Sequence, residues 1–400
     1  MRDVNLYGIS GLHEYVDAES FGLLLDNVNA KYNRAIWRNY ASWGEPTDDR
    51  EWKQGVKKTP IMVRASVLGT QSEKPQRSTQ GWEIYGGTLP QVGHGFSIIQ
   101  DDMIELRKVA KLSNLTFGEA LTDCFIQNST NMLGGVHNEL SYMTLQAMST
   151  GEIHDVAVDG YHFDFKFEIP NENFVSPDAG KEWFKYEGTG ADKKLVPNAD
   201  ADVIEDFLTF QKYYTDTRNL GVDHWKMSKW LFDMILKHPS VKNAFLASKY
   251  GNNYMNISIT EGDTTISHDP RIKVIQSELL QWMHRDMGIW PFDVIDFKSR
   301  HEEDGKPVND APAFDIHNMA AASRQYKPFE MKCMNSILKD RSKMGAHNDS
   351  VRTTFVENRI AVQNVWQDRP MMNIVDCELF AGPVFQNVQD YGIASVWSEA

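Results

Sequence analysis

The sequence predicts an α+β fold, and three observations support this prediction. A helical pattern runs from Thr116 to Thr150, apolar and polar residues alternate directly after it, and helices alternate with single strands from about Asp202 onward. Helical and strand periods in separate parts of one chain are typical of α+β proteins. With 400 residues, of which 41% are hydrophobic, the chain can bury a sizeable core.

The charge and the cysteines narrow the possible functions. Lys and Arg number 41 against 55 Asp and Glu, which gives a net charge of -14, and no basic run forms a phosphate-binding patch. Sequence-directed nucleic-acid recognition is therefore not expected, although an acidic protein can enclose nucleic acid without gripping it. The cysteines, Cys124, Cys333 and Cys377, form no CxxC pair, so we expect reduced, buried thiols rather than disulfides or a zinc ribbon.

Targeting signals are missing from the sequence. Residues 1–10 lack a charged segment followed by an apolar one, and nowhere do about 18 apolar residues follow one another. We expect a protein that is made in the cytosol and has no membrane partner.

The first 55 or so residues are predicted to form an arm. A possible helix over residues 18–40 precedes a loop around residues 43–46. The hydrophobic residues of this region form no pattern that would let the region bury them by itself. We therefore expect the arm to pack on something else.

A long projecting hairpin is predicted next. Two extended runs, Pro60–Leu68 and Trp82–Ile99, are separated by the polar stretch 69–78, which favours a mobile tip. Glycines and a proline punctuate the return strand, so that strand must bend or bulge.

The helix over residues 116–150 has clear ends. Thr116 and Glu119 form a capping box, and Gly151 supplies a left-handed stop. Such a helix spans roughly 50 Å. The pair Gly134-Gly135 predicts a bend in its middle.

The remaining elements follow in order. A hairpin with an Asp159-Gly160 turn has one buried face, formed by Tyr161, Phe163, Phe165, Phe167 and Ile169. Residues 177–197 read as a loop. Helices are expected over 203–214, 228–236, 240–247 and 271–287, a strand over 292–297, a turn at Asp304-Gly305, and strands over 355–366 and 371–379. A last strand that returns to the long helix would make one domain discontinuous in sequence.

Common catalytic signatures are missing, so we predict no catalytic residue, no metal and no cofactor. The sequence contains no HExxH, GxSxG or GxxxxGK[ST] motif. His301 and the acids after it read as a solvated hairpin, Asp101 and Asp102 as helix-start acids, and His137 as a surface or satisfied core histidine. Met132, Met143 and Met148 fall at helical spacing, which favours core packing.

A metal-dependent hydrolase is one alternative from another class. His162 and Asp164 share one face of a predicted strand, and His154 lies on the strand before it. Charged residues on the polar side of an amphipathic strand explain the same spacing. The cluster at His301 is a second candidate for such a site.

Four ordered segments carry a family resemblance. They are Trp82–Pro90, Leu145–Ile153, Phe292–Phe297 with Asp304-Gly305 and Asp310-Ala311-Pro312, and Arg369–Ile374 with Gln389–Ala394. Their order resembles the Hong Kong 97 fold of tailed-bacteriophage major capsid proteins, and in detail the lambda-type capsid protein E family. Three regions depart from it: the first 55 residues match nothing specific, the loop 177–197 is longer than expected, and Phe314–Arg352 looks like an insertion.

The resemblance implies a division into structural units. These are an N-terminal arm at 1–57, an extended E-loop at 58–98, a peripheral domain with the spine helix at 99–200, an axial domain at 201–354, and the return strand of the peripheral domain at 355–400.

The resemblance also implies a virion subunit that forms hexamers and pentamers of an icosahedral head around double-stranded DNA. Its partners would be copies of itself, a separate scaffolding protein, a portal and possibly a decoration protein. An arm and a hairpin that cannot bury their apolar residues alone gain partners in an assembly. The predicted inter-subunit contacts are Trp37, Trp52, Ile61, Val63, Trp82 and Tyr85. An encapsulin-like compartment, which encloses protein cargo, is the alternative with the same fold.

Overall fold

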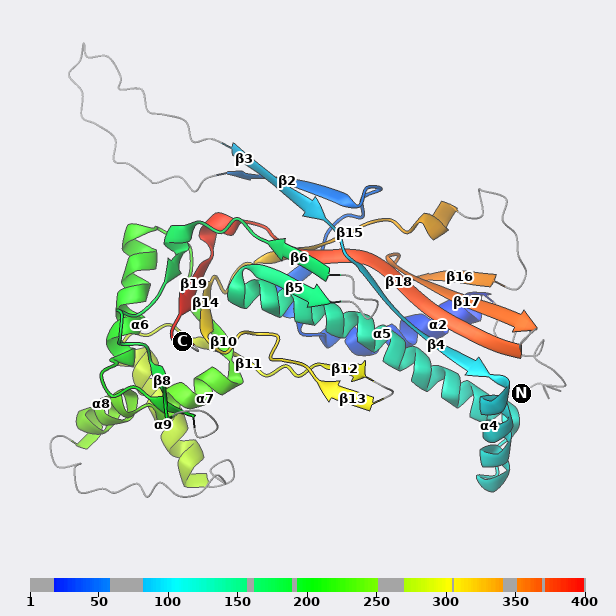
Figure 1. The fold of residues 1–400 in the computed structure, drawn as a ribbon, viewed down its shortest axis with the longest axis horizontal. Coiled ribbons are helices and arrows are strands. Elements are labelled where there is room, and N and C mark those ends of the chain that lie inside the picture. The colour runs from blue at the N-terminus through cyan, green and yellow to red at the C-terminus, as the bar shows by residue number, and fades with distance from the viewer. Residues whose placement is uncertain are drawn as a thin grey trace, which may run out of the picture.

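The computed structural model describes residues 18–57, 82–156, 162–188, 193–250, 270–303, 306–340, 351–368 and 371–398. These residues form an elongated molecule (Figure 1). A helix-rich body lies at one end, a long helix and a sheet run along the middle, and a short helix stands at the other end.

The elements up to the long helix are α2 (Ala18–Asn29), the 3-10 helix η1 (Ala30–Arg34), α3 (Trp37–Tyr40), β1 (Ala41–Trp43), β2 (Glu51–Lys57), β3 (Trp82–Thr88), β4 (Gln91–Ile99), α4 (Gln100–Leu112) and α5 (Phe117–Thr150). The middle elements are β5 (Glu152–Val156), β6 (His162–Lys166), β7 (Phe174–Val175), β8 (Phe184–Glu187), β9 (Lys194–Pro197), α6 (Val203–Lys212), the π-helix η4 (Tyr213–Thr217), β10 (His224–Ser228), α7 (Lys229–Lys237), α8 (Pro239–Tyr250) and α9 (Pro270–Arg285). The last elements are β11 (Phe292–Ile295), β12 (Arg300–Glu303), β13 (Lys306–Asn309), β14 (Asn318–Ala322), β15 (Phe329–Cys333), β16 (Val351–Val356), β17 (Ile360–Asp368), β18 (Met371–Phe385) and β19 (Gly392–Ser395).

The long helix α5 begins and ends as predicted. The Thr116 hydroxyl accepts a hydrogen bond from the Glu119 N–H at 3.3 Å, and the Glu119 carboxylate accepts one from the Thr116 N–H at 2.8 Å. Gly151 closes the helix in the left-handed conformation, with φ of 74°. The capping box and the glycine stop therefore fix both ends of a 34-residue helix.

Gly134 and Gly135 allow other parts of the chain to approach α5 closely. The helix continues through both glycines. A Cβ on Gly134 would lie 2.6 Å from the Tyr32 hydroxyl, and one on Gly135 would lie 3.2 Å from the His94 ring. The pair therefore has a packing role that the predicted bend did not include.

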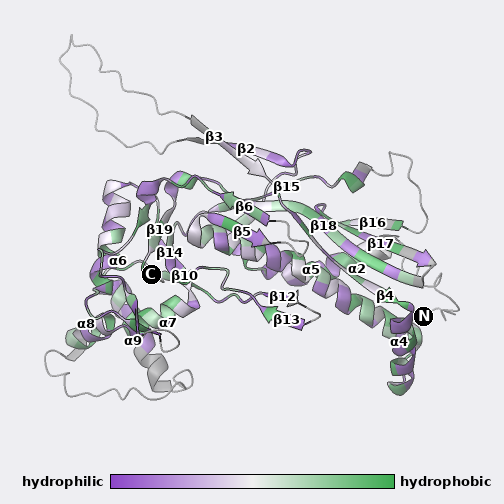
Figure 2. Ribbon diagram, in the orientation of Figure 1, coloured by the Kyte–Doolittle hydropathy of each residue, from purple (hydrophilic) through white to green (hydrophobic). Residues whose placement is uncertain are grey.

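The C-terminal strand β18 organises the main sheet, whose order is β1-β15-β18-β17-β16. Its first part, Met371 to Phe380, pairs with β17 on one side and β4 on the other, and its last part, Ala381 to Phe385, pairs with β15. β18 runs beside α5, and hydrophobic residues lie along much of this strand (Figure 2). The predicted return of a C-terminal strand to the long helix is confirmed.

Strand structure is confirmed over most of residues 355–366, but a turn divides the predicted strand between β16 and β17. β16 and β17 are joined by a tight turn at Glu357 and Asn358, which have φ of 51° and 58°. Two consecutive residues with positive φ are the signature of a hairpin turn that matches strand twist.

The predicted return strand of the projecting hairpin bends, as expected. β3 pairs with β2, whereas β4, beyond Leu89 and Pro90, leaves the hairpin and pairs with β18. The predicted first arm at 60–68 and the polar tip at 69–78 lie outside the described residues.

A five-stranded sheet, with the order β11-β10-β14-β19-β7, lies between two hydrophobic cores. Met319 and Ala321 of β14 face the core of the helix-rich body, and Ala320 and Ala322 face the core around α5. Both faces of the strand are therefore buried. Such a strand reads as a continuous apolar run and shows no alternation in sequence.

The interpretation of Phe314–Arg352 as an insertion is wrong. This segment contains β14, at the centre of the five-stranded sheet, and β15, which pairs with β1 and β18 in the main sheet. Neither sheet would be continuous without it.

The loop predicted over residues 177–197 is also wrong, because β8 and β9 form an antiparallel pair there. Trp183 and Phe184 are fully buried in the second core and give this short hairpin its position. The four predicted helices of the helix-rich body correspond to α6, α7, α8 and α9.

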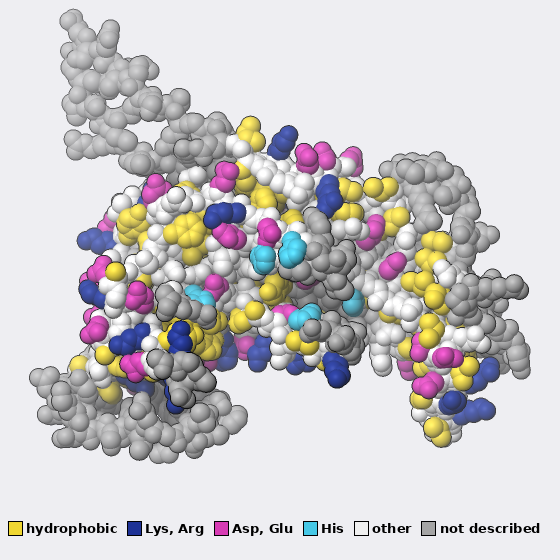
Figure 3. All heavy atoms as spheres, viewed as in Figure 1, with side chains coloured by type: hydrophobic (Ala, Val, Ile, Leu, Met, Phe, Trp, Pro, Cys, Tyr) yellow, Lys and Arg dark blue, Asp and Glu magenta, His cyan; other side chains and the backbone are white. Residues whose placement is uncertain are grey.

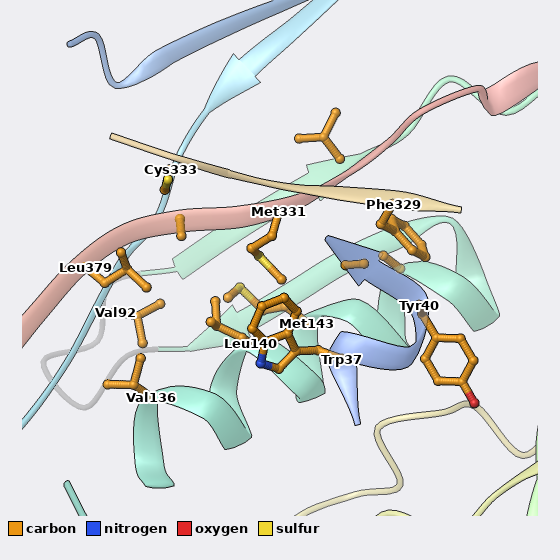
Figure 4. Close-up of a cluster of buried hydrophobic side chains, with 14 of the residues drawn as sticks. Trp37, Tyr40, Val92, Val136, Leu140, Met143, Phe329, Met331, Cys333 and Leu379 are labelled. Atoms are coloured by element: carbon orange, nitrogen blue, oxygen red, sulfur yellow. The ribbon is translucent and has the colours of Figure 1, made fainter. Parts of the chain in front are cut away.

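The N-terminal segment, residues 18–43, packs on its own chain, which corrects for these residues the prediction of an arm that packs on something else, whereas residues 1–17 of that arm lie outside the described residues. Leu25, Trp37 and Tyr40 are buried in the core around α5, and β1 pairs in parallel with β15. Trp37 lies among side chains of α5 and β15 (Figure 4). The predicted helix over 18–40 is divided into α2, η1 and α3.

Gly392 provides a test of packing between β19 and the helix-rich body. A Cβ at Gly392 would lie 2.6 Å from the Tyr214 ring, which is fully buried. We expect Gly392→Ala to lower the free energy of unfolding by about 1–3 kcal/mol through overpacking. Urea denaturation of both proteins measures the difference.

Gly221→Ala is the matched control, because no atom lies within 4 Å of its Cβ position. We expect it to change stability by less than about 0.5 kcal/mol. Equal stability of the two variants would contradict the described packing of β19.

Candidate assembly surface

Three of the six predicted contact residues are covered by their own chain. Trp37, Trp52 and Tyr85 have exposed fractions of 0, 5 and 7%. The Tyr85 hydroxyl donates to the Phe385 carbonyl at 2.5 Å, and the Trp52 and Tyr85 rings meet edge to face at 5.3 Å. The premise that these side chains cannot be buried within one chain is therefore wrong.

The other three predicted contacts remain predictions. Ile61 and Val63 lie outside the described residues, and of Trp82 only the backbone is described, at the start of β3. For Trp52 and Tyr85 the sequence could not assign the face that each side chain takes, because a shift of one residue in register reverses every side chain.

The root of the β2–β3 hairpin is fixed, and its outer face is uncovered. Gly87 approaches the Phe165 ring so closely that a Cβ there would overlap it, and Trp52 packs on the same ring at 5.7 Å. Ile84, next to buried Tyr85, points the other way and is 76% exposed. Ile84 is thus an exposed hydrophobic side chain on the outer face of the hairpin, where Lys53, Gly55 and Gly86 are its described neighbours.

A second uncovered apolar surface lies on α4, and the sequence reasoning missed it. Five of the twelve large hydrophobic side chains that are exposed in the described part of the chain fall within residues 99–115. These are Ile99, Ile104, Val109, Leu112 and Leu115. The available signal was that hydrophobic residues of the helix lie opposite Ala110, outside the single stripe that one core contact needs.

A chain of hydrogen bonds holds the N-terminal segment on α5. The Trp37 indole N–H donates to His137 Nδ1 at 3.2 Å, and His137 Nε2 lies 2.8 Å from Asn29 Oδ1. Because Nδ1 accepts a bond, the proton of the neutral ring must be on Nε2, which donates to Asn29. Asn29 in turn donates to Glu357 at 2.7 Å. The prediction of a satisfied core histidine is confirmed.

The Glu357 carboxylate is the acceptor at the end of this chain. It also accepts from Arg38 at 2.6 Å and from the Trp43 indole at 2.7 Å. Burial acts to raise the pKa of Glu357, but Arg38 and the three hydrogen bonds outweigh burial and lower it. These contacts offset the backbone strain of Glu357, which is a non-glycine residue with a positive φ.

The polar groups singled out from the sequence do not form a metal site in the described residues. His154 contacts Asp164 across β5 and β6, and the His162 ring lies 6.5 Å from the His154 ring. His301 contacts Asp310 at 2.5 Å. No group of three or more His, Cys, Asp or Glu within the described ranges could hold a metal ion.

The other singled-out residues have structural roles. Asp102 caps α4 by accepting from the Ile99 N–H at 3.0 Å, as predicted for a helix-start acid. Met132, Met143 and Met148 are buried core residues. Cys333 and Cys377 are buried and unpaired, whereas Cys124 is only partly buried. Within the described residues, no helix combines the length and apolar character that crossing a membrane needs.

Solved structures resemble this chain, although no protein-family model and no curated protein sequence matches it. A structure assigned as the capsid protein of a prophage from Escherichia coli CFT073 matches with a TM-score of 0.53 at 10% identity, over 95% of this chain and 99% of that one. A phage-related protein from Bordetella bronchiseptica RB50 matches with a TM-score of 0.44 at 10% identity, over 94% and 98%. The capsid of Myoviridae phage XM1 matches with 0.42 at 11%, over 91% and 92%.

The first of these matches establishes the fold. The chain has the fold of that prophage protein from end to end, and the predicted α+β fold of Hong Kong 97 type is confirmed. Identity of 10% conveys shape and not function.

The network around His137 predicts a pH dependence of stability. Burial, with a smaller contribution from Arg38, lowers the pKa of His137 from 6.5 to about 4. Between these values the unfolded chain binds a proton that the folded chain does not. The free energy of unfolding should therefore fall as the pH is lowered through this window, by about 3 kcal/mol in total from this residue.

His137→Gln retains a donor and an acceptor but does not titrate. We expect its loss of stability between pH 6.5 and 4 to be smaller than that of the native protein in urea denaturation. Identical pH profiles for the two proteins would show that His137 is not the titrating group.

Proposed function

We propose that this chain is the major capsid subunit of a tailed phage, which assembles as hexamers and pentamers into an icosahedral head around double-stranded DNA. The observation that supports this most strongly is the end-to-end fold match to the prophage capsid protein, over 95% of this chain and 99% of that one. An enzyme that had acquired this fold would need a site of its own, and the described residues lack a metal-binding cluster.

The two hydrophobic cores support a division of the subunit into two domains. The core around α5 and β18 would be the peripheral domain, and the core of α6 to α9 the axial domain at the capsomer centre. The buried N-terminal segment joins the peripheral domain, which moves the start of the proposed E-loop from residue 58 to β2. The hairpin that contains β2 and β3 would lie over a neighbouring subunit.

The uncovered surfaces suit a shell that is held by many modest contacts. Ile84 on the outer face of β3 and the hydrophobic side chains of α4 are exposed, and the described part of the same chain does not cover them. Contacts of this size are weak singly and become strong when each subunit makes several. A net charge of -14 lets the shell enclose DNA without binding it tightly.

Other components follow from the same proposal. A separate scaffolding protein would direct assembly, a portal would occupy one vertex, and decoration proteins would bind the outside. The subunit would be made in the host bacterial cytoplasm and reside in the virion. It would need no cofactor and would catalyse no reaction.

Electron microscopy of particles purified from cells that produce the chain tests the proposal. We expect closed icosahedral shells, with packed double-stranded DNA and a portal vertex in the native particle. DNA-free shells that contain a protein cargo would indicate an encapsulin-like compartment instead of a phage capsid. A stable, monodisperse monomer at high concentration would contradict both.

Ile84→Asp tests the outer face of the hairpin. Because Ile84 is 76% exposed, we expect the fold to be unchanged, as judged by circular dichroism and thermal unfolding. Burial of an isoleucine side chain is worth about 1.5–3 kcal/mol, so the charged variant should form far fewer particles at equal protein concentration.

Ile84→Val is the control, since it keeps an apolar side chain at the same place. It should assemble nearly as well as the native protein. Full assembly of Ile84→Asp would exclude this face from the subunit contacts.

A further inference from the structure

Both ends of helix α4 are capped, although little of its surface is covered. At its start the Asp102 carboxylate accepts from the Ile99 N–H. At its end Asn114 takes a positive φ of 53°, and the Leu115 N–H donates to the Ala110 carbonyl at 3.0 Å. Arg107 also lies over the Phe117 ring at 5.6 Å. A short helix that is fixed at both ends presents a defined surface.

The uncovered side of α4 is apolar. Ala110 is the buried residue of the helix, at 2% exposure, and faces its own chain. At ~100° per residue, Ile104, Val109 and Leu112 fall within an arc of about 140° on the opposite side. Their exposed fractions are 47, 53 and 86%. Exposed apolar residues gathered in this way mark a site of interaction.

Charges on α4 are separated along its length. Asp101, Asp102 and Glu105 lie in the first half, and Arg107, Lys108 and Lys111 in the second. Figure 3 shows acidic and basic side chains grouped at different heights of this helix, at the lower right, with hydrophobic ones among them. The order of charges suits the helix dipole, but the dipole does not account for the apolar residues between them.

We propose that α4 pairs in antiparallel orientation with α4 of a second copy of this chain, about a two-fold axis near the middle of the helix. In this arrangement the acidic half of each helix lies beside the basic half of the other, and the apolar residues are covered. One surface then serves both partners, which is the property of a two-fold interface. A parallel pair would instead place like charges together.

Other occupants fit this surface less well. Three acids in the first half of α4 disfavour DNA and anionic lipid, and both halves would have to find their complement on a single partner. A second copy of α4 has both an acidic and a basic half, and so it supplies the complement to each half of the first. Figure 1 places α4 at the extreme end of the molecule, where a second copy can approach it.

The pairing names a specific contact within the assembly and rests on the proposed function only in requiring that copies associate. Crosslinking of engineered cysteines tests it, in a chain that carries Cys124→Ser to remove the partly buried thiol. One variant carries Asp101→Cys and Leu112→Cys together. The matched control carries Leu112→Cys alone.

The two positions separate the possible orientations. They lie about 16 Å apart along one helix, which is too far for a disulfide within the chain. In an antiparallel pair, position 101 of one copy lies beside position 112 of the other. After mild oxidation of the assembled protein, we expect roughly tenfold more covalent dimer from the double variant than from the control.

Charge reversal provides a second readout. Lys108→Glu with Lys111→Glu leaves Arg107 as the only basic side chain of α4 and should reduce the dimer several-fold. Adding Asp101→Lys and Glu105→Lys in the same chain restores a helix with two opposite halves and should restore dimer formation. Asp102 is left unchanged because it caps α4. Circular dichroism confirms that each variant folds.

The outcomes are distinguishable from those for the capsid role. Crosslinking of Leu112→Cys alone at the level of the double variant would indicate a parallel pair and overturn the proposal. Normal particles without crosslinking would overturn the pairing and leave the capsid function standing. Crosslinked dimers in a protein that forms no shell would support the pairing and count against the capsid function.

Discussion

The structure depends on the need to cover one long helix. α5 has 34 residues and is about 51 Å long, and residues such as Met132, Leu140 and Met148 must be buried along it. The 15-residue strand β18 is about 50 Å long and matches that length. Because β18 comes from the far end of the chain, its partners β4, β15 and β17 are drawn to the same helix, and the core around α5 forms from segments that are distant in sequence.

Polar contacts also attach the N-terminal segment to the rest of the fold. Glu357 collects donors from Asn29, Arg38 and Trp43, and so fastens the N-terminal segment to the turn between β16 and β17. His137 links the same segment to α5 and stays neutral because it is buried. β14 places alternate residues in the two cores, so this one strand packs against both the core around α5 and the core of the helix-rich body.

Once both cores are formed, six of the twelve large hydrophobic side chains that are exposed in the described residues lie on the β2–β3 hairpin and on or beside α4. Ile84 is the one on the hairpin, whose root packs on Phe165, and the other five lie on or beside α4, whose start is capped by Asp102. Exposed apolar side chains that gather on one element are suited to contacts between copies. A shape shared at 10% identity is possible because burial patterns, and not particular side chains, specify the fold.

The sequence by itself determined the elements that are specified locally. The capping box at Thr116, the stop at Gly151 and the helical period between them depend on neighbours within a few residues, and so α5 could be predicted closely. Tertiary structure alone decided the rest. β14 is buried on both faces and has no alternation to read, β15 is defined by its partners, and Trp37, Trp52 and Tyr85 are interior because strands far away in sequence cover them. The surface of α4 could be recognised only from the structure, in which the described part of the chain leaves it uncovered, since exposure is a property of the whole fold and not of a segment.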